Sequence, residues 1–461
     1  MSQNYYLAID LGASSGRGIV GWYEDMATSG NSAVEAGCTA STIVSHHAGR
    51  LHTCETYRFA NEPTIVDESL TWDIDRLFHE VKQTIAATLR EFPTLTSLSI
   101  DTWGVDYVLM RGDEPIYPCY AYRDSRTEAT FAAVHSLIPP EALYARTGIQ
   151  QLPMNTIYQL YDDKLRGRLT PEVTDFLMMP EYFLYRLTGI KAKEYTIAST
   201  SGLLNARSRQ FDSEIVAALG LPERLFPEVR QPGFVLGKLL PEVAAEVGGQ
   251  AQVLFCPTHD TASAVEGIPM DIDAPFLSSG TWSLLGVKLD DPRTDVESRT
   301  AGFTNEGGVG YIRYLKNITG MWIFQCLCKE LGLSFAQIEE SARSSQFKAI
   351  FDVNDPRFTA PVNMRAEIVA ALGIQELDDA DLLSSVYHSL AHCYRETLTA
   401  LECNAGRNWD RLYIVGGGAK NKYLNELTAE YTGKRVIVLP IEATALGNIV
   451  VQSRTTATKM P

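Results

Sequence analysis

The sequence predicts an α/β protein made of two similar lobes with a cleft between them. Short apolar segments rich in strand-forming residues alternate with segments typical of helices. A strand–turn–strand hairpin opens the first half of the chain, and a second hairpin of the same layout follows in the other half, which favours a duplicated unit. The chain has 461 residues, more than one compact core of usual size holds, so two domains are expected.

The first hairpin begins close to the start of the chain. Tyr5–Asp10 is predicted to be a strand, Gly12–Gly16 a tight turn of small residues, and Gly18–Tyr23 a second strand. The stretch Glu24–Arg50 is rich in Ala, Ser, Thr, Gly and His without periodicity, so we expect an extended loop there. Ser97–Asp101 is another short strand that ends in an aspartate.

The second hairpin joins the predicted strands Phe276–Ser279 and Trp282–Val287 through Gly280 and Thr281. The other elements expected in this half are the strands Val253–Cys256, Leu412–Val415 and Val436–Leu439, a helix from His259 to Val265, a helix that ends near Tyr431, and the helix Thr444–Val451. Proline and glycine gather in the segment 238–250 just before a new strand. We therefore place the two lobes at residues 1–245 and 246–461.

The composition is that of an ordinary globular protein, with 45% hydrophobic and 21% charged residues. The 40 Lys and Arg residues against 56 Asp and Glu residues give a net charge of −16, which argues against nucleic acid or an anionic membrane as a partner. No apolar run has the length of a membrane span, and the first ten residues do not read as a signal peptide. The eight cysteines are expected to be buried free thiols, and the protein is expected in the cytoplasm.

The first hairpin turn is a candidate anion site. Its small residues allow consecutive backbone N–H groups to point at one anion, and Ser14 and Ser15 add hydroxyl donors. Asp10, at the end of the strand, is placed to hold the hydration shell of Mg²⁺. A plain hairpin turn remains the alternative, because the segment is not the P-loop pattern G-x-x-x-x-G-K-[ST].

Three further segments could carry chemistry. Asp260 stands at a strand–helix junction and could take a proton from a substrate hydroxyl, with His259 bonding a hydroxyl beside it; a helix-capping role is the alternative. The loop Asp101–Asp106 offers carboxylates for sugar hydroxyls and Trp103 for stacking, or else it holds only a core tryptophan. Gly416–Gly418 lets a nucleotide approach the backbone, or forms only a tight turn.

In this order the motifs resemble those of the FGGY family of carbohydrate kinases. The resemblance spans nearly the whole chain, and so many motifs in one order are specific to the family. The segments that carry it are Ile9–Arg17, Thr71–Asp73, Ile100–Tyr107, Ala121–Thr127, Tyr185–Gly189, Glu194–Thr200, Thr258–Val265, Leu277–Leu284, Thr304–Gly308, Leu315–Trp322, Ile414–Asn421 and Glu442–Ile449. The long Glu24–Arg50 stretch and the short segment after Gln452 depart from the family pattern, although neither touches these motifs.

The resemblance implies the two-lobed actin-like (ribonuclease H-like) ATPase fold, with sugar and ATP bound in the cleft between the lobes and Mg²⁺ as the metal. It implies that Asp260 is the catalytic base that deprotonates the sugar hydroxyl. The remaining residues that it assigns are Gly104, His259, Thr261 and Asn317 at the sugar, Ala13, Ser14, Ser15, Gly16, Arg17, Thr281, Gln325 and Gly418 at ATP, and Asp10 at Mg²⁺ through water.

Within the family, the strings IDTWGVD and YRDSRT point to the branch that phosphorylates L-rhamnulose to L-rhamnulose 1-phosphate in rhamnose catabolism. A kinase for another ketose such as L-fuculose or L-xylulose is the nearest alternative. A sugar sensor of the same fold without transfer activity is a third hypothesis, although a pure binder needs no base at Asp260. The expected partners are the sugar and ATP only, and the chain is expected to act as a monomer or homodimer.

Overall fold

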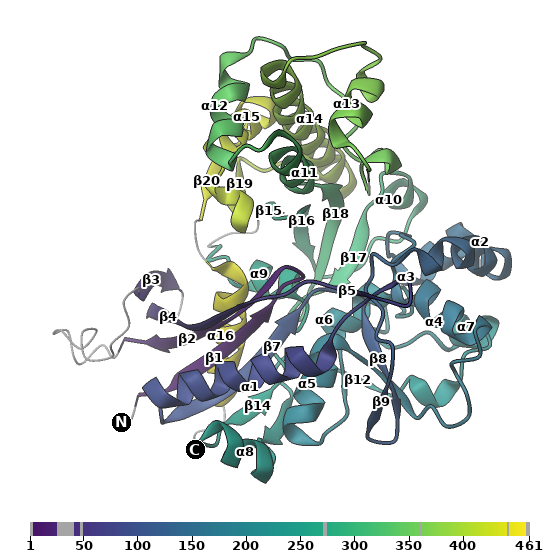
Figure 1. Cartoon of the computed structure of the whole chain (residues 1–461), viewed down its shortest axis with the longest axis vertical. Helices are drawn as coiled ribbons and strands as arrows, with labels where there is room; N and C mark the ends of the chain where they lie inside the picture. The colour runs from purple at the N-terminus through teal and green to yellow at the C-terminus, as the bar shows by residue number, and fades with distance from the viewer. Residues whose placement is uncertain are drawn as a thin grey trace.

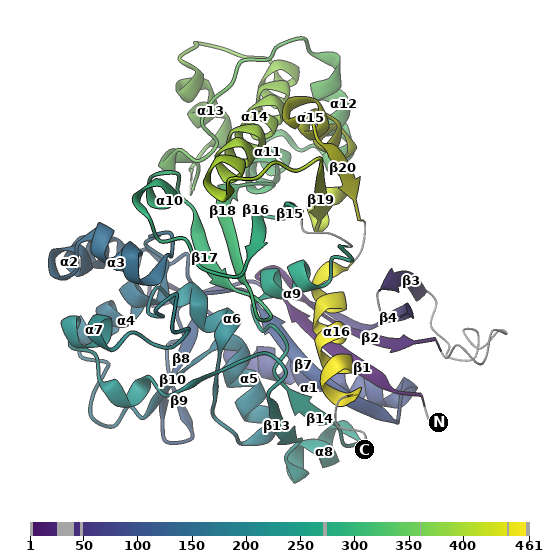
Figure 2. The same cartoon turned by 180° about the vertical axis from the view of Figure 1, so that it is seen from behind.

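Two β-sheets, each with its own helices, give the molecule its upper and lower parts in Figures 1 and 2. The structure is a computed structural model. It describes residues 3–24, 41–46, 49–270, 274–359, 361–439 and 442–457, with only the backbone given for 41–46 and for residue 49. The prediction of a two-lobed α/β architecture is confirmed.

The sheet of the first lobe has seven strands in the order β13-β14-β7-β1-β2-β4-β3. In chain order these strands are β1 (Tyr5–Leu11), β2 (Ser15–Tyr23), β3 (Ser41–His46), β4 (Gly49–Ala60), β7 (Leu95–Thr102), β13 (Val235–Lys238) and β14 (Gln252–Leu254). β1 and β2 form the predicted antiparallel hairpin, and β7 runs parallel to β1 so that Asp10 and Asp101 are neighbours. The stretch predicted as a loop from Glu24 to Arg50 contains the strand β3, while residues 25–40 lie outside the described part.

Helices cover both faces of this sheet. α1 (Ile74–Glu91) packs on one face through a stripe of buried residues that includes Leu77, Val81 and Ile85, and its N-cap Asp73 accepts a hydrogen bond from the backbone N–H of Arg76. α9 (Asp260–Glu266) and α16 (Ala443–Ala457) lie together on the opposite side, with α16 packed along β1 and β7. The last described helix of the chain therefore belongs to the first sheet.

The sheet of the second lobe has six strands in the order β17-β18-β16-β15-β19-β20. Its strands are β15 (Phe276–Ser279), β16 (Trp282–Leu289), β17 (Thr304–Gly307), β18 (Ile312–Thr319), β19 (Arg411–Val415) and β20 (Arg435–Val438). Its helices are α10 (Val296–Thr300), α11 (Trp322–Leu331), α12 (Phe335–Ser344), α13 (Met364–Leu372), α14 (Asp379–Ala405) and α15 (Lys422–Thr432). β15 and β16 form the second predicted hairpin.

The remaining elements lie between β7 and β14 in the chain, apart from a small ribbon before α1. The ribbon is β5 (Thr64–Val66) and β6 (Ser69–Thr71). The others are β8 (Tyr107–Arg111), β9 (Glu114–Ile116), α2 (Glu128–Leu137), α3 (Pro140–Thr147), α4 (Thr156–Leu165), β10 (Asp175–Met178), α5 (Met179–Thr188), β11 (Lys193–Glu194), α6 (Tyr195–Ala198), α7 (Ser213–Ala218), β12 (Val229–Arg230) and α8 (Pro241–Val247). The predicted lobe boundary at residues 245 and 246 falls inside α8, and it stays a prediction.

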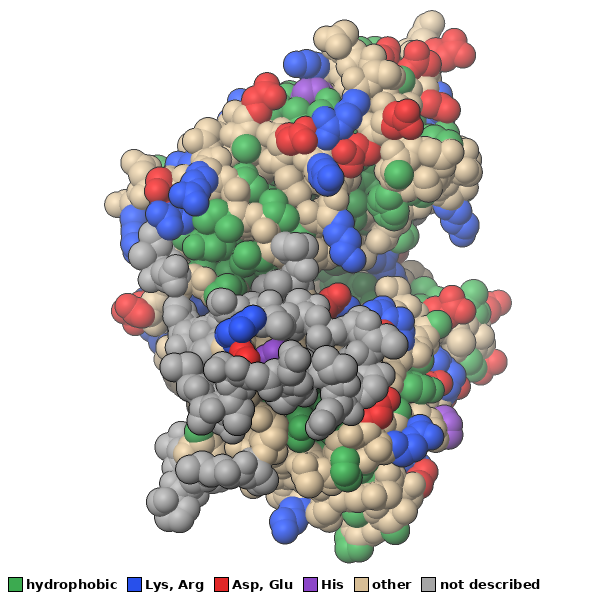
Figure 3. All heavy atoms as spheres, turned by 90° about the vertical axis from the view of Figure 1, so that its left-hand side faces the viewer, with side chains coloured by type: hydrophobic (Ala, Val, Ile, Leu, Met, Phe, Trp, Pro, Cys, Tyr) green, Lys and Arg blue, Asp and Glu red, His purple; other side chains and the backbone are tan. Residues whose placement is uncertain are grey.

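The surface charges, the length of the helices and the state of the cysteines can be compared with the sequence-based expectations. Figure 3 shows lysine and arginine side chains scattered among acidic ones over the described residues of one face. Of the helices described, none is both long and apolar enough to cross a membrane. Six cysteines of the described residues are free thiols: Cys119 and Cys256 are buried, Cys326, Cys328 and Cys393 are half-buried, and Cys403 is exposed. Cys54 is disulfide-bonded, and Cys38 lies outside the described residues. The expectation of buried free thiols is therefore confirmed only at Cys119 and Cys256. An apolar sequence context predicts that a cysteine is buried, but it does not show whether the fold pairs that cysteine with another one.

Candidate active site

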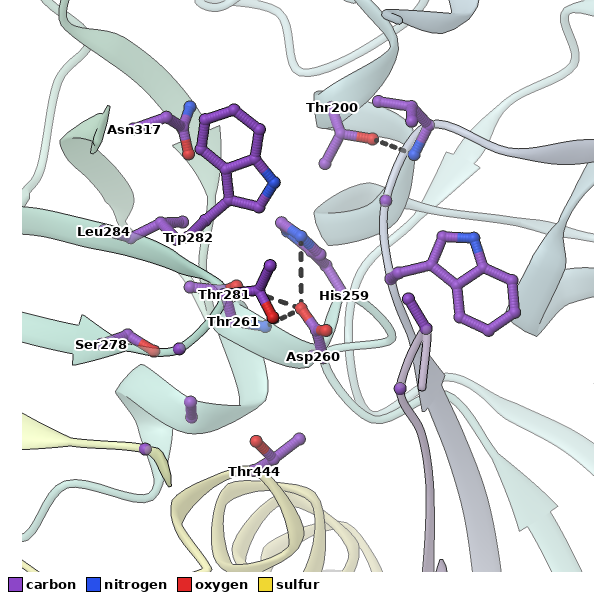
Figure 4. A pocket seen from close by; sticks show the side chains of 18 of the residues that line it. Thr200, His259, Asp260, Thr261, Ser278, Thr281, Trp282, Leu284, Asn317 and Thr444 are labelled. Atoms are coloured by element: carbon purple, nitrogen blue, oxygen red, sulfur yellow. Dashed lines mark hydrogen bonds and ion pairs between the residues drawn. The ribbon is translucent and has the colours of Figure 1, made fainter. Parts of the chain in front are cut away.

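A cavity of about 630 Å³ lies where the two lobes meet. The first lobe supplies the turn of the β1–β2 hairpin, the loop after β7 and the start of α9. The second lobe supplies the turn of the β15–β16 hairpin and the glycines after β19. The start of α16, which packs on the first sheet, completes the lining. Figure 4 shows Asp260, His259 and Thr261 on one wall, with Trp282, Asn317 and Thr200 around them.

Asp260 is the first residue of α9, directly after the turn that ends the strand β14. Its Oδ1 atom accepts hydrogen bonds from the backbone N–H of Thr261 at 2.5 Å and from the Thr261 hydroxyl at 3.0 Å. Burial, and then the negative charge of Asp10, raises the pKa of Asp260 to about 7. A carboxylate with a pKa near neutral is suited to accept a proton and release it again.

His259 lies between Asp260 and the second lobe. Its Nε2 atom is 3.4 Å from Oδ1 of Asp260, and its Nδ1 atom is 3.0 Å from Nη2 of Arg313. Burial, and then the positive charge of Arg313, holds the pKa of His259 well below its usual value. The imidazole is therefore neutral near pH 7.

Asp10 and Arg17 face each other across the first hairpin, as register partners on β1 and β2. Nε and Nη2 of Arg17 donate to Oδ2 of Asp10 at 3.0 and 2.8 Å, and Nη1 lies 2.5 Å from Oε2 of Glu442. Two carboxylates thus neutralise Arg17, although its side chain still lines the cavity. Asp10 is buried behind the turn and does not line the cavity itself.

The carboxylate of Asp10 is the group near the cavity that is placed to hold Mg²⁺. The described residues contain no group of three or more His, Cys, Asp or Glu side chains that could hold a metal ion by itself. Mg²⁺ commonly keeps several waters and binds through one or two carboxylates together with substrate phosphates. The carboxylate of Asp10, close enough to Asp260 to raise its pKa, fits that role.

The first hairpin turn is held in one shape by Asn61. The side chain of Asn61 donates to the carbonyl of Gly12 at 2.9 Å, and its backbone N–H donates to the carbonyl of Ser14 at 3.1 Å. The N–H of Gly12 closes the turn on the carbonyl of Ser15 at 2.9 Å. Ala13 and Ser14 line the cavity, whereas Ser15 and Gly16 do not.

The second hairpin turn brings Thr281 and Gln325 together. The carbonyl of Thr281 accepts from the N–H groups of Gly320 and Trp322, each at 3.2 Å, which ties the turn to the start of α11. The Gln325 side chain reaches the Thr281 hydroxyl at 3.5 Å, and both residues line the cavity. Thr281 and Gln325, which were both expected at ATP, are thus neighbours in the fold.

The glycine segment after β19 packs tightly against the second hairpin. A Cβ atom on Gly418 would lie 2.1 Å from Oγ of Ser279, so Gly418 is pressed against the hairpin and does not line the cavity. Gly416 has a φ of +89°, a conformation that L side chains rarely adopt, and it lines the cavity together with Gly417. The glycine backbone that faces the cavity is therefore that of Gly416 and Gly417, whereas Gly418 was the position expected at ATP.

The carboxylates of the loop after β7 do not face the cavity. Asp106 is fully buried, and its Oδ2 atom accepts from the indole N–H groups of Trp72 and Trp103 at 2.7 and 2.9 Å. Asp101 is also fully buried and accepts from the side chain of Asn448 at 2.6 Å. The expectation that these carboxylates bind sugar hydroxyls is wrong, because both side chains are fully buried and neither lines the cavity.

Gly104 does line the cavity, and Val105 beside it has an unusual backbone. A Cβ atom on Gly104 would lie 3.3 Å from the hydroxyl oxygen of Thr200 and 3.4 Å from Nε2 of His259. Val105 has a φ of +68°, which is costly for a β-branched residue. Its N–H donates to the Thr200 hydroxyl at 3.2 Å, and its carbonyl accepts from Thr156 at 2.7 Å. These contacts hold the loop in a conformation that the sequence alone does not reveal.

Two contacts join the lobes across the cavity. The side chain of Asn317, on β18, donates to Oε1 of Gln150 in the first lobe at 3.1 Å. The guanidinium of Arg123 lies 4.6 Å from the ring centre of Trp322, at the start of α11. Arg123 lies in the quoted segment Ala121–Thr127 but was given no role from the sequence, and Gln150 was not singled out, because polar residues of a loop carry no periodic signal.

The structure thus brings most of the predicted residues to one cavity. Those that line it are Ala13, Ser14, Arg17, Gly104, His259, Asp260, Thr261, Thr281, Asn317 and Gln325. Asp10, Ser15, Gly16 and Gly418 lie behind the lining. Thr200 and Glu306, which also line it, belong to quoted motifs but were given no role from the sequence.

Comparison with known proteins gives a consistent result. The model described as "FGGY family of carbohydrate kinases, N-terminal domain" matches residues 33–267, and that of the C-terminal domain matches residues 276–456. A protein named rhamnulokinase from Halalkalibacterium halodurans is 39% identical over 458 residues, covering 97% of this chain and 93% of its own length. A rhamnulokinase from Oceanobacillus iheyensis is 37% identical over 461 residues, covering 98% and 93%.

Solved structures share the fold at low sequence identity. A gluconate kinase from Lactobacillus acidophilus superposes with a TM-score of 0.78 at 15% identity, over 100% of this chain and 91% of its own. Plasmodium falciparum glycerol kinase with ADP superposes with a TM-score of 0.76 at 12% identity, over 100% and 91%. These matches confirm the predicted two-lobed, actin-like fold.

Proposed function

The chain belongs to the FGGY family of carbohydrate kinases, and from this premise we propose that it transfers the γ-phosphoryl group of ATP to the C1 hydroxyl of L-rhamnulose. The products are L-rhamnulose 1-phosphate and ADP. The substrate assignment is supported by identity of 37–39% to rhamnulokinases over nearly the full length. The observation that carries the catalytic part is the position of Asp260, a half-buried carboxylate with a pKa of about 7 on the wall of the interlobe cavity.

Asp260 is the general base of the proposed reaction. Its carboxylate accepts the proton of the C1 hydroxyl while that oxygen bonds to the γ-phosphorus and the bond from phosphorus to the oxygen of ADP breaks. General-base help of this kind contributes about 10²- to 10⁴-fold to the rate. Most of the remaining acceleration comes from holding the two reactants in line.

ATP lies against the two hairpin turns in this proposal. The backbone of Ala13 and Ser14 faces the phosphates from the first lobe, and Thr281 and Gln325 face the nucleotide from the second lobe. Arg17 stays neutralised by its two carboxylates, so the net charge of the turn remains low. Asp10 would hold Mg²⁺ through water, and the ion would supply there the positive charge that the phosphates need.

The sugar lies between Gly104, His259, Thr261 and Asn317 in this proposal. Asn317 already touches the first lobe through Gln150, so a sugar bound there contacts both lobes at once. Closing the cavity around the sugar excludes water, which would otherwise accept the phosphoryl group. The division of the chain at residues 245 and 246, with sugar mainly on the first lobe and ATP on the second, is part of the proposal, although β14 and α9, which follow residue 246, pack with the first sheet.

A screen of ATP consumption over ketoses tests the function. The purified chain is incubated with Mg-ATP and L-rhamnulose, L-fuculose or L-xylulose, and ADP release is followed by a coupled assay. We expect the highest kcat/KM with L-rhamnulose and negligible ADP release without sugar. A higher kcat/KM with another ketose would reassign the substrate and leave the mechanism in place. No release with any of the sugars would favour a sugar sensor without transfer activity.

A further inference from the structure

Arg313, on β18, is a fully buried arginine next to the proposed base. Its Nε donates to the carbonyl of Gly307 at 2.7 Å, and Nη2 lies 3.1 Å from Oε2 of Glu306 and 3.0 Å from Nδ1 of His259. Glu306, on β17, is buried as well. A buried guanidinium is costly unless it is paired and hydrogen-bonded, so a pair placed here against a site histidine calls for an explanation.

The contact with Arg313 decides which nitrogen of His259 carries the proton. A guanidinium can only donate hydrogen bonds, so Nδ1 of His259 must accept and be unprotonated. In the neutral ring the proton is then on Nε2, the atom that lies 3.4 Å from Oδ1 of Asp260 and faces Gly104. Burial and the charge of Arg313 lower the pKa of His259, which keeps the ring in this neutral form.

We propose that Arg313 and Glu306 are a positioning pair that fixes His259 as a neutral Nε2–H donor. The Nε2–H group of His259 then faces Asp260 at 3.4 Å in the free enzyme and donates to a sugar oxygen when the substrate is bound, and it does not compete with Asp260 for the proton. Glu306 compensates the charge of Arg313 through a contact of 3.1 Å with Nη2, the same nitrogen that faces His259. This inference rests on the proposed function for its kinetic readouts, but the tautomer of His259 is independent of the sugar.

The charged groups around His259 show why a positioning pair is needed. Asp260 on α9 faces Nε2 of the ring, and Glu306 on β17 lies 3.5 Å from Nδ1. Asp10 on β1 adds negative charge at Asp260, and the buried carboxylate of Glu194 accepts from the hydroxyl of Thr258, the residue before His259. All these groups favour an imidazolium, and Arg313 is the cation that opposes them among the residues described. Without Arg313 only burial would oppose protonation of the ring, and the pKa of His259 would rise.

The tautomer can be read directly in the wild-type protein. Long-range ¹H–¹⁵N spectra of the protein labelled at histidine, recorded near pH 7.5, distinguish the Nε2–H, Nδ1–H and charged rings, and the His259→Gln variant assigns the signal. We expect a neutral ring protonated on Nε2 and no change in form down to pH 6. A ring protonated on Nδ1, or one that becomes charged near pH 6.5, overturns the proposal without the need for a variant at Arg313.

A double substitution tests the role of the pair in turnover. Arg313→Gln with Glu306→Gln removes both charges together, so that no buried carboxylate is left unpaired. Because the loss of a group that sets a histidine tautomer is costly to catalysis, we expect kcat to fall by at least about tenfold, with the KM for ATP unchanged. The acid limb of the pH–rate profile should also acquire a second ionisation, that of His259. An unchanged kcat and an unchanged pH profile in the folded variant overturn the proposal.

The same double substitution in a His259→Gln background separates positioning from a structural role. If Arg313 acts through His259, the double substitution lowers kcat by less than about twofold when the histidine is already absent. An equal loss with and without His259 shows a structural role and contradicts the proposal. Failure of the proposed function would appear instead as no ADP release by the wild type with any ketose, which leaves the spectroscopic test in place.

Discussion

At the residue scale, the decisive feature is the protonation of Asp260. The base must be charged to accept the sugar proton, yet it is partly desolvated and lies near the negative charge of Asp10, so its pKa is about 7. Two hydrogen bonds from Thr261 stabilise the charged form and limit this rise. The balance of burial against hydrogen bonds therefore sets the pH at which the site works.

This balance predicts a specific pH dependence. Because the reaction needs the deprotonated form, log(kcat/KM) for the sugar should rise with unit slope up to pH about 7 and level off above it. Asp260→Asn should bind sugar and lose kcat by about 10²-fold or more. Thr261→Val, which removes one hydrogen bond to the charged carboxylate, should shift the acid limb to higher pH. Stopped assays over the pH range measure all three, and a shift to lower pH in Thr261→Val would contradict the explanation.

At the element scale, the position of Asp260 depends on how α9 crosses α16. The helices cross at two glycines: a Cβ atom on Gly447 would lie 1.8 Å from the carbonyl oxygen of Ser263, and one on Gly267 would lie 2.0 Å from that of Ala443. Such close backbone contact leaves no room for even one methyl group. The first residue of α9 is thus held through a helix that comes from the other end of the chain.

Gly447→Ala is predicted to separate the two helices. Overpacking at such a contact costs about 1–3 kcal/mol, so the free energy of unfolding should fall by that amount. Because Asp260 moves with α9, kcat should fall while α9 and α16 remain helical by circular dichroism. Gly417→Ala is the matched control, since a Cβ atom there meets no atom within 4 Å, and it should leave the stability unchanged. Equal stabilities of the two variants would show that the crossing has room to adjust.

At the scale of the whole molecule, buried acids couple stability to pH. Glu181, near the start of α5, accepts from the N–H groups of Met178 and Glu194 at 2.9 and 2.7 Å. Burial raises its pKa to about 8 and that of Asp260 to about 7. In the unfolded chain both carboxyl groups have lost their protons by about pH 5. Between that pH and the folded pKa values the folded state therefore holds more protons than the unfolded chain, and the free energy of unfolding falls as the pH rises.

We therefore expect the protein to be less stable at pH 8 than at pH 6.5. His259 and His388, whose pKa is lowered in the folded state, oppose this trend by a few tenths of a kcal/mol each, because in the unfolded chain they still release protons between about pH 6.5 and 7.5. Urea unfolding at high salt, which screens the net charge of −16, should show a loss of about 2 kcal/mol over this range. Glu181→Gln should make the dependence shallower. A stability that rises over the same range would contradict the role of these acids.

The sequence allowed the strands, both hairpin turns and the helix at Asp260 to be predicted, because each rests on local composition and turn residues. It misled at Asp101 and Asp106, since an aspartate at a strand end reads as exposed, and the indole of Trp72 that buries one of them lies far away in the chain. Arg313 and Glu306 were missed for a related reason. Each is an ordinary strand residue until the pairing of β17 with β18 places them beside His259.

The return of α16 to the first sheet also affects how the protein is made. Tyr6, Ala8, Ile19 and Leu51 of the first sheet form a buried apolar cluster with residues of α16 such as Leu446 and Ile449. On the ribosome these strands emerge long before α16, and the entire second lobe is synthesised in between. Until then this apolar face lacks its helix and is a site where chaperones can bind the nascent chain. The lobe that is translated first is the last to complete its core.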